Sequence, residues 1–492
     1  MSGADLKSKT IYGMIWAASQ RFGTMILSFV SNLILARLLT PDDFGAIGMI
    51  AIFIALSNNF IDGGFGASLI QKTDTTENEY STIFFWNLFL SIIIYFIIWL
   101  SSPCIASFFE IAILCDLLRC QSIVLIVNAL GLVQRIRLRK QLLFKKLAIV
   151  DLASSIFAVC SAIFAAYSGF GVWSLILYQI VFSCCQTLGL WISHKWCPIF
   201  IFDFQSFKSL FKYGGYLLIS DMLNTLCDNL QGLLIGKRFS PAVMGYYSQA
   251  KKLEEVPTNS ISNIVAQVTF PVFSQLKGNI DALKTAHQKC IHATNFINIP
   301  LMSLLIVIAH PLILFLFTDK WVDSISYFRI LCIAGLANCL QSINYQLYVA
   351  MGYSKAMFKW NIIKRGIGIG LIIIGAVFGV KGILWGMVIS FWITYFINAR
   401  LAGRVTGYFL SRQLIEIVPI LLITIVSCVS SFFLGYVITY HYAIIMMVQV
   451  VIFLVTYLFL SYIFKIPALR IYTQILSETM ISIRNRISKN NK

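Results

Sequence analysis

The chain has 492 residues, of which 59% are hydrophobic and only 12% charged, and its mean hydropathy is +0.82. A soluble domain carries about 25% charged residues, so this composition excludes a soluble protein and predicts a chain that lies mostly in lipid. The net charge of +18 does not indicate nucleic-acid binding, because no polar stretch is long enough to fold into a soluble domain with a basic face.

Apolar stretches long enough to cross a bilayer as helices, about 20 residues each, recur along the chain. Fourteen are predicted, at about 11–36, 44–62, 81–101, 114–134, 147–168, 172–192, 212–236, 256–275, 292–317, 325–350, 358–379, 382–399, 414–438 and 442–464. The even number puts both termini on one side of the membrane. The expected fold is an all-α integral membrane protein with about 14 transmembrane helices.

A duplication relates the first predicted span to the seventh. At an offset of 200 residues, ARLLTPDDFG (36–45) aligns with GKRFSPAVMG (236–245), so that Pro41 falls on Pro241 and both windows end in glycine. Six spans separate the copies, so both copies have the same orientation. Parallel repeats of this length are typical of secondary transporters, in which two halves enclose a central site.

The repeat and the spans together predict two parallel six-helix lobes around a central cavity, with two C-terminal helices beside them. The expected segments are an N-lobe at 1–200 (transmembrane helices 1–6), a C-lobe at 201–410 (helices 7–12), helices 13–14 at 411–464 and a basic cytoplasmic tail at 465–492.

Lys and Arg collect in cytoplasmic loops, and their distribution predicts that both termini are cytoplasmic. Lys212, Lys359, Lys364 and Arg365, in the first two turns of their spans, are counted with the adjoining inside loop. With that orientation, three of the 38 Lys and Arg then lie within spans and only seven lie in outside loops, namely Arg37, Lys237, Arg238, Lys251, Lys252, Lys320 and Lys381. The densest inside cluster, which we interpret as a determinant of topology, contains Arg135, Arg137, Arg139, Lys140, Lys145 and Lys146.

Few ionisable side chains lie within the predicted spans, where each costs at least about 2.5–3.5 kcal/mol on insertion scales and is expected to face a cavity or a partner. They are Arg21, Asp62, Asp116, Arg119, Asp151, Asp221, Asp228, Arg329 and Glu416. Arg21 falls on Asp221 at the repeat offset, so the two repeats present opposite charges at equivalent positions. The predicted site lies there.

Three cations, Arg21, Arg119 and Arg329, are the candidate substrate-binding residues of the cavity. A guanidinium suits a phosphate-bearing ligand because its planar fork donates two hydrogen bonds at once. In the structural alternative, Arg21 forms an ion pair with Asp221 or Asp228 that only holds one conformation. Asp116 and Arg119, three residues apart, are expected to pair with each other, and Arg329 to extend toward the membrane interface.

The acids Asp221 and Asp228 are the candidate ion-coupling residues, because a carboxylate at membrane depth is what proton coupling needs. Asp62, Asp151 and Glu416 lie close to span ends and are expected to be solvated. The histidines show no metal-ligand spacing, so neither a metal site nor a cofactor is predicted. Transport would then run on an H⁺ or Na⁺ gradient, on membrane potential or on the substrate gradient.

Glycine pairs within the eleventh and twelfth predicted spans favour close helix packing. Gly366 and Gly370, and Gly382 and Gly386, have the four-residue spacing of small residues at helix contacts. The run GIGIG at 366–370 follows no strand, so it does not indicate a nucleotide site.

Four motifs resemble the Wzx-like polysaccharide transporters of the multidrug/oligosaccharidyl-lipid/polysaccharide exporter superfamily. They are the turn ARLLTPDDFG at 36–45, DGGFG at 62–66, YYSQA at 246–250 and FPVFSQL at 270–276. The similarity extends over essentially the whole chain.

This resemblance implies a flippase of the bacterial cytoplasmic (inner) membrane and not an enzyme. Such a protein turns undecaprenyl-diphosphate-linked oligosaccharide to the periplasmic leaflet by alternating access, for O-antigen of lipopolysaccharide, capsule or exopolysaccharide. The implied partners are the lipid-linked oligosaccharide and membrane lipid, with the polysaccharide polymerase machinery as a further candidate and no nucleic acid.

Two other functions remain open. An ion-coupled multidrug or small-cation exporter would use Asp221 and Asp228 as its site. A membrane glycan polymerase or ligase is the third hypothesis, although no loop between spans is long enough to form a soluble domain that could hold a sugar.

Overall fold

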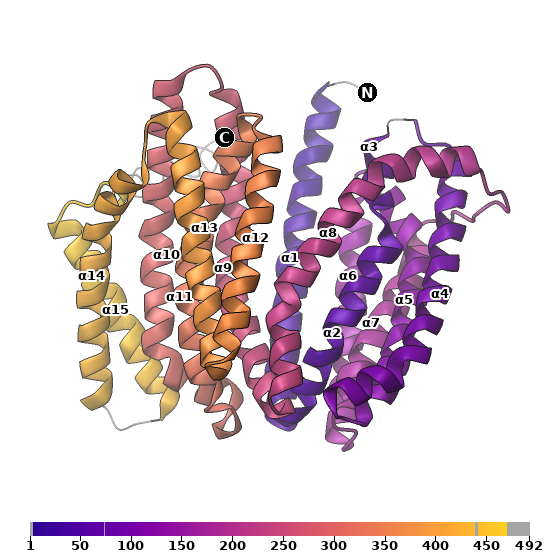
Figure 1. Ribbon diagram of the computed structural model, residues 1–492, viewed down its shortest axis with the longest axis horizontal. Helices are drawn as coiled ribbons and strands as arrows, with labels where there is room; N and C mark the ends of the chain where they lie inside the picture. The colour runs from indigo at the N-terminus through magenta and orange to yellow at the C-terminus, as the bar shows by residue number, and fades with distance from the viewer. Residues whose placement is uncertain (1–2, 73, 438–440, 470–492) are drawn as a thin grey trace, which may run out of the picture. The chain divides into compact units, whose positions relative to one another are not determined.

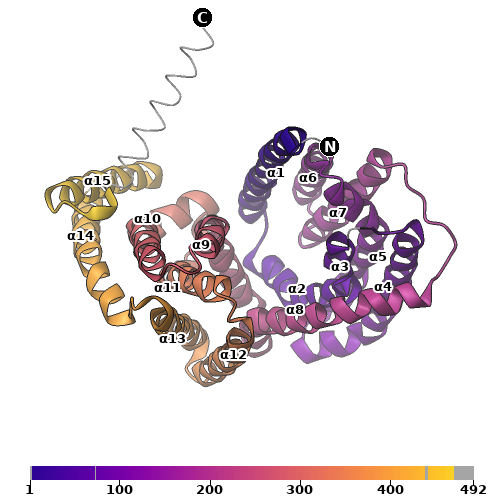
Figure 2. The same ribbon diagram turned by 90° about the horizontal axis from the view of Figure 1, so that it is seen from above.

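A computed structural model describes residues 3–72, 74–437 and 441–469, which form α-helices and one short 3-10 helix and no strand (Figures 1 and 2). The all-α membrane fold is therefore confirmed for this part of the chain. Most of the predicted basic tail at 465–492 lies outside the described residues.

The elements are α1 (Gly3–Leu38), α2 (Pro41–Asp62), α3 (Phe65–Gln71), α4 (Glu77–Phe109), α5 (Ile113–Lys140), α6 (Phe144–Tyr167), α7 (Trp173–Ser193), α8 (Phe204–Arg238), α9 (Pro241–Gln275), α10 (Ile280–Phe317), η1 (Asp319–Trp321), α11 (Ser324–Ala350), α12 (Ser354–Ala376), α13 (Gly379–Thr406), α14 (Leu410–Val437) and α15 (Tyr442–Ile463).

Ten segments in the described part of the chain are long and apolar enough to cross a membrane. The four predicted spans that are not among them lie on α8, α9, α11 and α12. Polar residues lower their mean hydropathy, such as Asp221 and Asp228 on α8 and Lys364 and Arg365 on α12. The number fourteen therefore stays a prediction.

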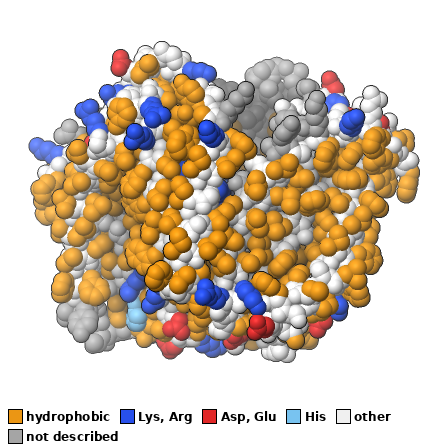
Figure 3. All heavy atoms as spheres, viewed as in Figure 1, with side chains coloured by type: hydrophobic (Ala, Val, Ile, Leu, Met, Phe, Trp, Pro, Cys, Tyr) orange, Lys and Arg blue, Asp and Glu red, His pale blue; other side chains and the backbone are white. Residues whose placement is uncertain are grey.

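Large apolar side chains cover the outer surface of the helices. In Figure 3 hydrophobic side chains fill the middle of the visible face, and most charged side chains lie toward its upper and lower edges. Among the exposed residues are Phe164, Ile192, Phe378 and Tyr462, each more than 70% accessible. Soluble monomers rarely expose apolar surface on this scale, and a bilayer accounts for it.

The chain divides into two compact units, residues 1–248 and residues 249–492. The N-terminal unit contains α1 to α8 and the first turns of α9. Helix α8 belongs to it through contacts with α2, α3 and α4. The predicted lobe boundary between residues 200 and 201 stays a prediction.

The two copies of the repeated turn have the same local structure. Each long helix ends three residues before the proline, and the next helix begins at that proline. Thr40 caps α2 through a capping box with Asp43, and the Ser240 hydroxyl accepts a 3.5 Å hydrogen bond from the Val243 N–H. A hydroxyl before a proline at the first helical position is a strong helix start, which explains why both copies turn here.

Within the N-terminal unit these two turns pack directly on each other. A Cβ atom on Gly45 would lie 1.9 Å from the carbonyl oxygen of Pro241, and a Cβ atom on Gly245 would lie 1.9 Å from that of Pro41. The contact is therefore reciprocal, as expected for two copies related by an approximate two-fold axis. Only glycine allows the two backbones to approach this closely.

Asp151 on α6 is the centre of a buried polar cluster that joins four helices. Its carboxylate accepts hydrogen bonds from Arg135 Nη2 at 2.7 Å, from Gln186 Nε2 at 2.8 Å and from the side chain of Gln20. Those donors come from α5, α7 and α1, and Asp151 is only 5% exposed. The expectation that Asp151 is solvated is wrong, because neighbouring helices supply every donor that water would have supplied.

Arg137, next in the basic cluster of α5, binds the start of α4. Its Nη1 contacts Glu77 Oε2 at 2.5 Å, and its guanidinium lies over the rings of Tyr80 and Trp196, with centroid distances of 4.7 and 5.3 Å. The Trp196 indole N–H donates to the same carboxylate at 2.6 Å. Arg137 therefore connects α5, α4 and the segment before α8.

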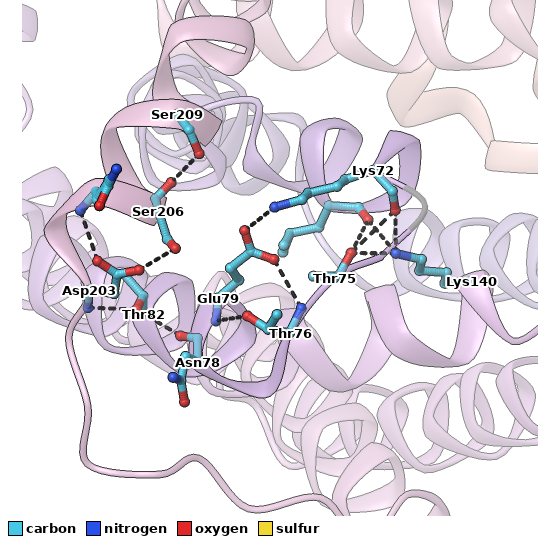
Figure 4. Close-up of polar contacts among 12 residues, drawn as sticks. Lys72, Thr75, Thr76, Asn78, Glu79, Thr82, Lys140, Asp203, Ser206 and Ser209 are labelled. Carbon is cyan, nitrogen blue, oxygen red and sulfur yellow. Dashed lines mark hydrogen bonds and ion pairs between the residues drawn. The ribbon is translucent and has the colours of Figure 1, made fainter.

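Lys140, at the end of α5, binds the end of the short helix α3 (Figure 4). Its ammonium donates to the carbonyl oxygens of Leu69 at 3.1 Å and Lys72 at 2.5 Å, and also to the hydroxyl of Thr75. A cation at a helix C-terminus satisfies free carbonyls and complements the helix dipole. The basic cluster thus has a packing role besides the predicted role in topology.

The start of α8 is held in the same region (Figure 4). Asp203 caps the helix, and its backbone N–H donates to Thr82 Oγ1 of α4 at 3.0 Å. Hydrogen bonds from the Ser206 hydroxyl and from the backbone N–H of Gln205 lower the pKa of the Asp203 carboxyl below its ordinary value. The connection between α7 and α8 is therefore anchored on α4.

In the C-terminal unit, α12 and α13 cross at glycines. A Cβ atom on Gly382 would lie 2.2 Å from the Gly375 carbonyl oxygen, and one on Gly386 would lie 2.6 Å from that of Leu371. The predicted packing role of Gly382 and Gly386 is confirmed. The role predicted for Gly366 and Gly370 is wrong, because a Cβ atom on either would have no neighbour within 4 Å.

The two C-terminal helices, α14 and α15, pack on α10. Their core contains Phe296, Tyr395, Phe453 and Tyr457, and the Tyr457 hydroxyl donates to the Phe296 carbonyl oxygen at 3.0 Å. This packing fixes the predicted helices 13 and 14 beside the helices of their own unit.

We expect Gly45→Ala and Gly245→Ala each to destabilise the protein by about 1–3 kcal/mol or more, because the added methyl group overlaps a backbone carbonyl. The measurement is the fraction of detergent-solubilised protein that stays monodisperse after heating. Gly366→Ala is the matched control, since that helical glycine has open space around it. Equal stability of Gly45→Ala and Gly366→Ala would contradict the close crossing.

We expect Asp151→Ala to cost about 3 kcal/mol of unfolding free energy, at the lower end for a buried pair because Arg135 is partly exposed. Chemical unfolding in detergent measures it. The double variant Arg135→Gln with Asp151→Asn should lose less unfolding free energy than the sum of its two single variants. Each single variant leaves one charge unpaired, whereas the double variant leaves none. Strict additivity would show that the two side chains do not interact.

Candidate functional site

Arg21 lies beside the face of α1 that packs on α6. The residues of that face recur every three or four positions, as a helix requires, and are Gly13, Trp16, Gln20 and Gly23. Arg21 itself is exposed. Among the residues that the structure describes, its guanidinium has no hydrogen-bond or ion-pair partner, and only its backbone carbonyl accepts a bond, from Thr24 at 3.2 Å.

Arg119 is held by the preceding helix. Its Nε donates to Ser102 Oγ at 3.0 Å, and its guanidinium lies 4.5 Å from the ring centroid of Trp99, both on α4. Asp116 is exposed on the first turn of α5. The expected ion pair between Asp116 and Arg119 is therefore wrong for the described side chains, because Arg119 turns toward α4 instead.

Arg329 is half-buried in the C-terminal unit. Its Nε donates to the backbone carbonyl of Ile306 on α10 at 3.2 Å. It therefore binds a neighbouring helix, whereas we expected it to extend toward the interface.

Asp221 and Asp228 are both exposed on α8. Asn59 of α2 donates to the Asp221 backbone carbonyl at 3.4 Å and also to the Thr225 hydroxyl, so α2 contacts this face of α8. Neither acid forms an ion pair with Arg21 among the described contacts. The structure thus does not pair Arg21 with Asp221, although the repeat places these opposite charges at equivalent positions.

Asp62, the last residue of α2, binds the turn that leads into the short helix α3. Its carboxylate accepts hydrogen bonds from the backbone N–H groups of Gly64 and Gly66. The turn needs φ values of +55° at Gly63 and +72° at Gly64, which glycine adopts without strain. A Cβ atom on Gly64 would also lie 2.4 Å from the Gly214 carbonyl oxygen of α8. The expectation that Asp62 is solvated is wrong, because the turn directs backbone donors at it.

Glu416 is also bound within the protein. Its carboxylate accepts hydrogen bonds from His292 Nε2 at 2.9 Å and from the Tyr408 hydroxyl, and Arg412 lies 3.8 Å away. The expectation of a solvated Glu416 is therefore wrong. The donors come from α10 and from the turn before α14, which a span boundary read from hydropathy cannot reveal.

A buried histidine lies next to this group and was missed from the sequence. His287 is 0% exposed, with Nε2 3.1 Å from Asn344 Oδ1 and Nδ1 3.4 Å from Thr406 Oγ1. Gln413 continues the network, because its side chain contacts both Asn344 and Tyr395. These polar groups come from four helices and show no common spacing in the sequence.

Two further buried charges are not among those that the sequence analysis placed within spans. Lys364 is 7% exposed, and its ammonium donates to Asn398 Oδ1 at 2.8 Å. Glu254 is also 7% exposed and accepts a hydrogen bond from Thr258. Only their burial distinguishes them, and burial depends on which face of the helix packs inward.

The three predicted cations differ in whether the protein binds their guanidinium groups. Of the three predicted cations, Arg119 and Arg329 bind protein groups, and Arg21 alone has a guanidinium without a partner among the described residues. In the same residues no cluster of three His, Cys, Asp or Glu could hold a metal ion. Of these three cations, Arg21 is therefore the one whose guanidinium no described protein group binds.

The chain is similar in sequence to several curated proteins of polysaccharide biosynthesis. The chain is 25% identical to the "Teichuronic acid biosynthesis protein TuaB" of Bacillus subtilis (strain 168), over 73% of this chain and 74% of that protein. It is 25% identical to the "Lipopolysaccharide biosynthesis protein WzxC" of Escherichia coli (strain K12), over 83% and 85%, and to the "Succinoglycan biosynthesis transport protein ExoT" of Rhizobium meliloti (strain 1021), over 76% of each chain.

Solved transporter structures share the fold. "Lipid II flippase MurJ, inward closed conformation" superposes with a TM-score of 0.74 over 92% of this chain and 98% of that chain, at 16% identity. An inward-facing multidrug resistance transporter of the MATE family gives 0.61 over 80% and 98%, at 15% identity. The sequence profile described as "Polysaccharide biosynthesis protein" matches residues 34–326, more than half of the 492 residues. The chain therefore belongs to the polysaccharide biosynthesis protein family.

Proposed function

We propose that this protein is a flippase that moves an undecaprenyl-diphosphate-linked oligosaccharide across the bacterial cytoplasmic membrane for surface polysaccharide synthesis. Family membership supports a role in polysaccharide biosynthesis. A relative named as a transport protein, ExoT, and a structural neighbour named as a lipid II flippase support transport of the precursor.

Arg21 is the observation that carries the proposal. An ionised arginine at bilayer depth costs at least about 2.5–3.5 kcal/mol and is expected to have a partner or to face water. Because the described residues supply the Arg21 guanidinium with no acid and no hydrogen-bond acceptor, it is left to water or to a ligand, and we infer that an anionic ligand binds there. A diphosphate fits, since a guanidinium donates two parallel hydrogen bonds to it.

The mechanism follows from this charge. The diphosphate and its sugars bind near Arg21 in the cytoplasm-facing state, while the polyprenyl tail stays in the lipid. The two lobes then rock so that the site opens to the other side, and both termini stay in the cytoplasm. Since the protein makes and breaks no covalent bond in this cycle, it is a transporter and not an enzyme. The released precursor passes to the polysaccharide polymerase machinery.

An ion-coupled exporter of cations is the second candidate. The two exposed acids of α8, Asp221 and Asp228, and the likeness to a multidrug resistance transporter favour it. In that case the acids would bind the cation and Arg21 would be dispensable. The two functions therefore predict opposite effects for the same variants.

We expect Arg21→Ala to reduce export of surface polysaccharide at least about tenfold, because a charge-assisted hydrogen bond contributes about 1.5–3 kcal/mol. Cytoplasmic-leaflet lipid-linked oligosaccharide should accumulate, and mass spectrometry of lipids from vesicles of defined orientation measures it. Arg21→Lys should retain part of the activity, because it keeps the charge and loses the bidentate geometry.

Arg400→Ala is the matched control, because Arg400 is an exposed arginine at another helix. It should leave export unchanged at equal protein level in the membrane. Normal polymer with Arg21→Ala, together with drug sensitivity of Asp221→Asn and Asp228→Asn, would reject the flippase in favour of the cation exporter.

Arg119→Gln should lower thermal stability and leave flipping per folded molecule unchanged. It removes a hydrogen bond to Ser102 and a cation–π contact with Trp99, together about 1–3 kcal/mol. Heating curves and flipping measured on the same preparation separate the two effects. A transport defect in a fully stable Arg119→Gln protein would instead support the predicted role of Arg119 in substrate binding.

A further inference from the structure

Glu254 on α9 is a carboxylate enclosed in the C-terminal unit. It is 7% exposed, and its one hydrogen-bond partner among the described residues is the Thr258 hydroxyl, one helical turn further on, which donates to Oε1. A side chain four positions along the same helix always lies within reach. The carboxyl therefore has a neutral partner.

The space that holds this carboxyl depends on a glycine of α11. A Cβ atom on Gly335 would lie 2.5 Å from Glu254 Oε1, 2.8 Å from Thr258 Oγ1 and 3.2 Å from Met302 Sδ of α10. Any larger residue at position 335 would displace the acid. The three helices α9, α10 and α11 thus leave a small pocket that the Glu254 side chain fills.

The charged groups around the pocket do not neutralise it. On α9, Lys251 and Glu255 interact electrostatically with Glu254, but Lys251 forms its ion pair with Glu255 at 3.8 Å. The facing groups of α11 that titrate are the thiols of Cys332 and Cys339. The side chain facing it from α10 is the thioether of Met302.

A carboxylate without a cation partner is strongly disfavoured in such surroundings, whereas the neutral acid with a hydrogen bond is tolerated. Because Thr258 donates to Oε1, the proton would be carried on Oε2. If α9 and α11 separate and water enters, the carboxyl can ionise and release that proton. The two protonation states therefore prefer different packings of these helices.

We propose that Glu254 is a proton-binding site that is occupied when α9, α10 and α11 close around it and is emptied when they separate. This proposal rests on the proposed function in one respect, namely that opening and closing of the C-terminal unit is part of the flipping cycle. It assigns the coupling role to an acid that the sequence analysis missed. Asp221 and Asp228 are exposed, so closure would change their charge less.

Infrared difference spectroscopy of the full-length protein in lipid nanodiscs tests proton binding directly. At neutral pH we expect the carbonyl stretch of a protonated carboxylic acid in the wild type, and we expect Glu254→Gln to lack it. Glu255→Gln is the matched control, since Glu255 is the adjacent acid and is paired with Lys251. An unchanged band in Glu254→Gln would overturn the site.

Thr258→Val is a second variant that keeps the acid and the shape of its surroundings. It removes the hydroxyl that stabilises the ionised form, so the pH midpoint of the band should rise by about one unit. A midpoint that stays in place would show that Thr258 does not contact the titrating group and would count against the pocket described here.

Flipping in proteoliposomes tests the coupling, with undecaprenyl diphosphate bearing one fluorescent sugar as the probe. The wild type and Glu255→Gln should flip faster when a pH difference is imposed, and Glu254→Gln should flip at a rate that no longer depends on it. Full dependence in Glu254→Gln would overturn the coupling role. A wild type that flips nothing would reject the proposed function, and the infrared result would then decide the proton site alone.

Discussion

The crossing of the two repeated turns is the constraint on which the N-terminal unit depends. The carbonyl groups of Pro41 and Pro241 occupy the space where Gly245 and Gly45 would carry a Cβ atom. Such a contact can form only if both turns have the same shape, which duplication provides. Because α8 leads directly into the second turn, this crossing also places α8 against α2. The first helix of the second repeat therefore packs with the first repeat.

Charge pairing then fixes the other helices of that unit. Arg135, Arg137 and Lys140 project from the last turns of α5 to α6, α4 and α3, and each finds an acid or free carbonyl groups there. In a membrane, helices gain little from hydrophobic association, so polar contacts and close packing determine their arrangement. A cluster that orients the chain in the membrane can thus also hold its helices together.

The sequence predicts the features that depend on local composition. Apolar stretches predicted where helices lie. The repeat predicted that Pro41 and Pro241 begin equivalent helices, because a proline turn and its cap depend only on a few neighbouring residues. Features that depend on helix rotation could not be predicted. Asp151 and Glu416 were assigned to solvent from their distance to a span end, and Lys364 was counted with a loop. Hydropathy averaged over a window does not say which side of a helix faces a neighbour.

Charged side chains in this molecule differ in whether another protein group pairs with them, and this difference distinguishes structural roles from functional ones. Arg119 and Asp151 have partners that satisfy them, so their removal is expected to affect folding. Among the described residues, Arg21 is a cation without an acceptor, and Glu254 is an acid that forms no ion pair. The first lies in the N-terminal unit and the second in the C-terminal unit. If an anion compensates Arg21 and a proton compensates Glu254, then substrate and driving ion bind to different units. Each can then be removed by mutation without destroying the site of the other.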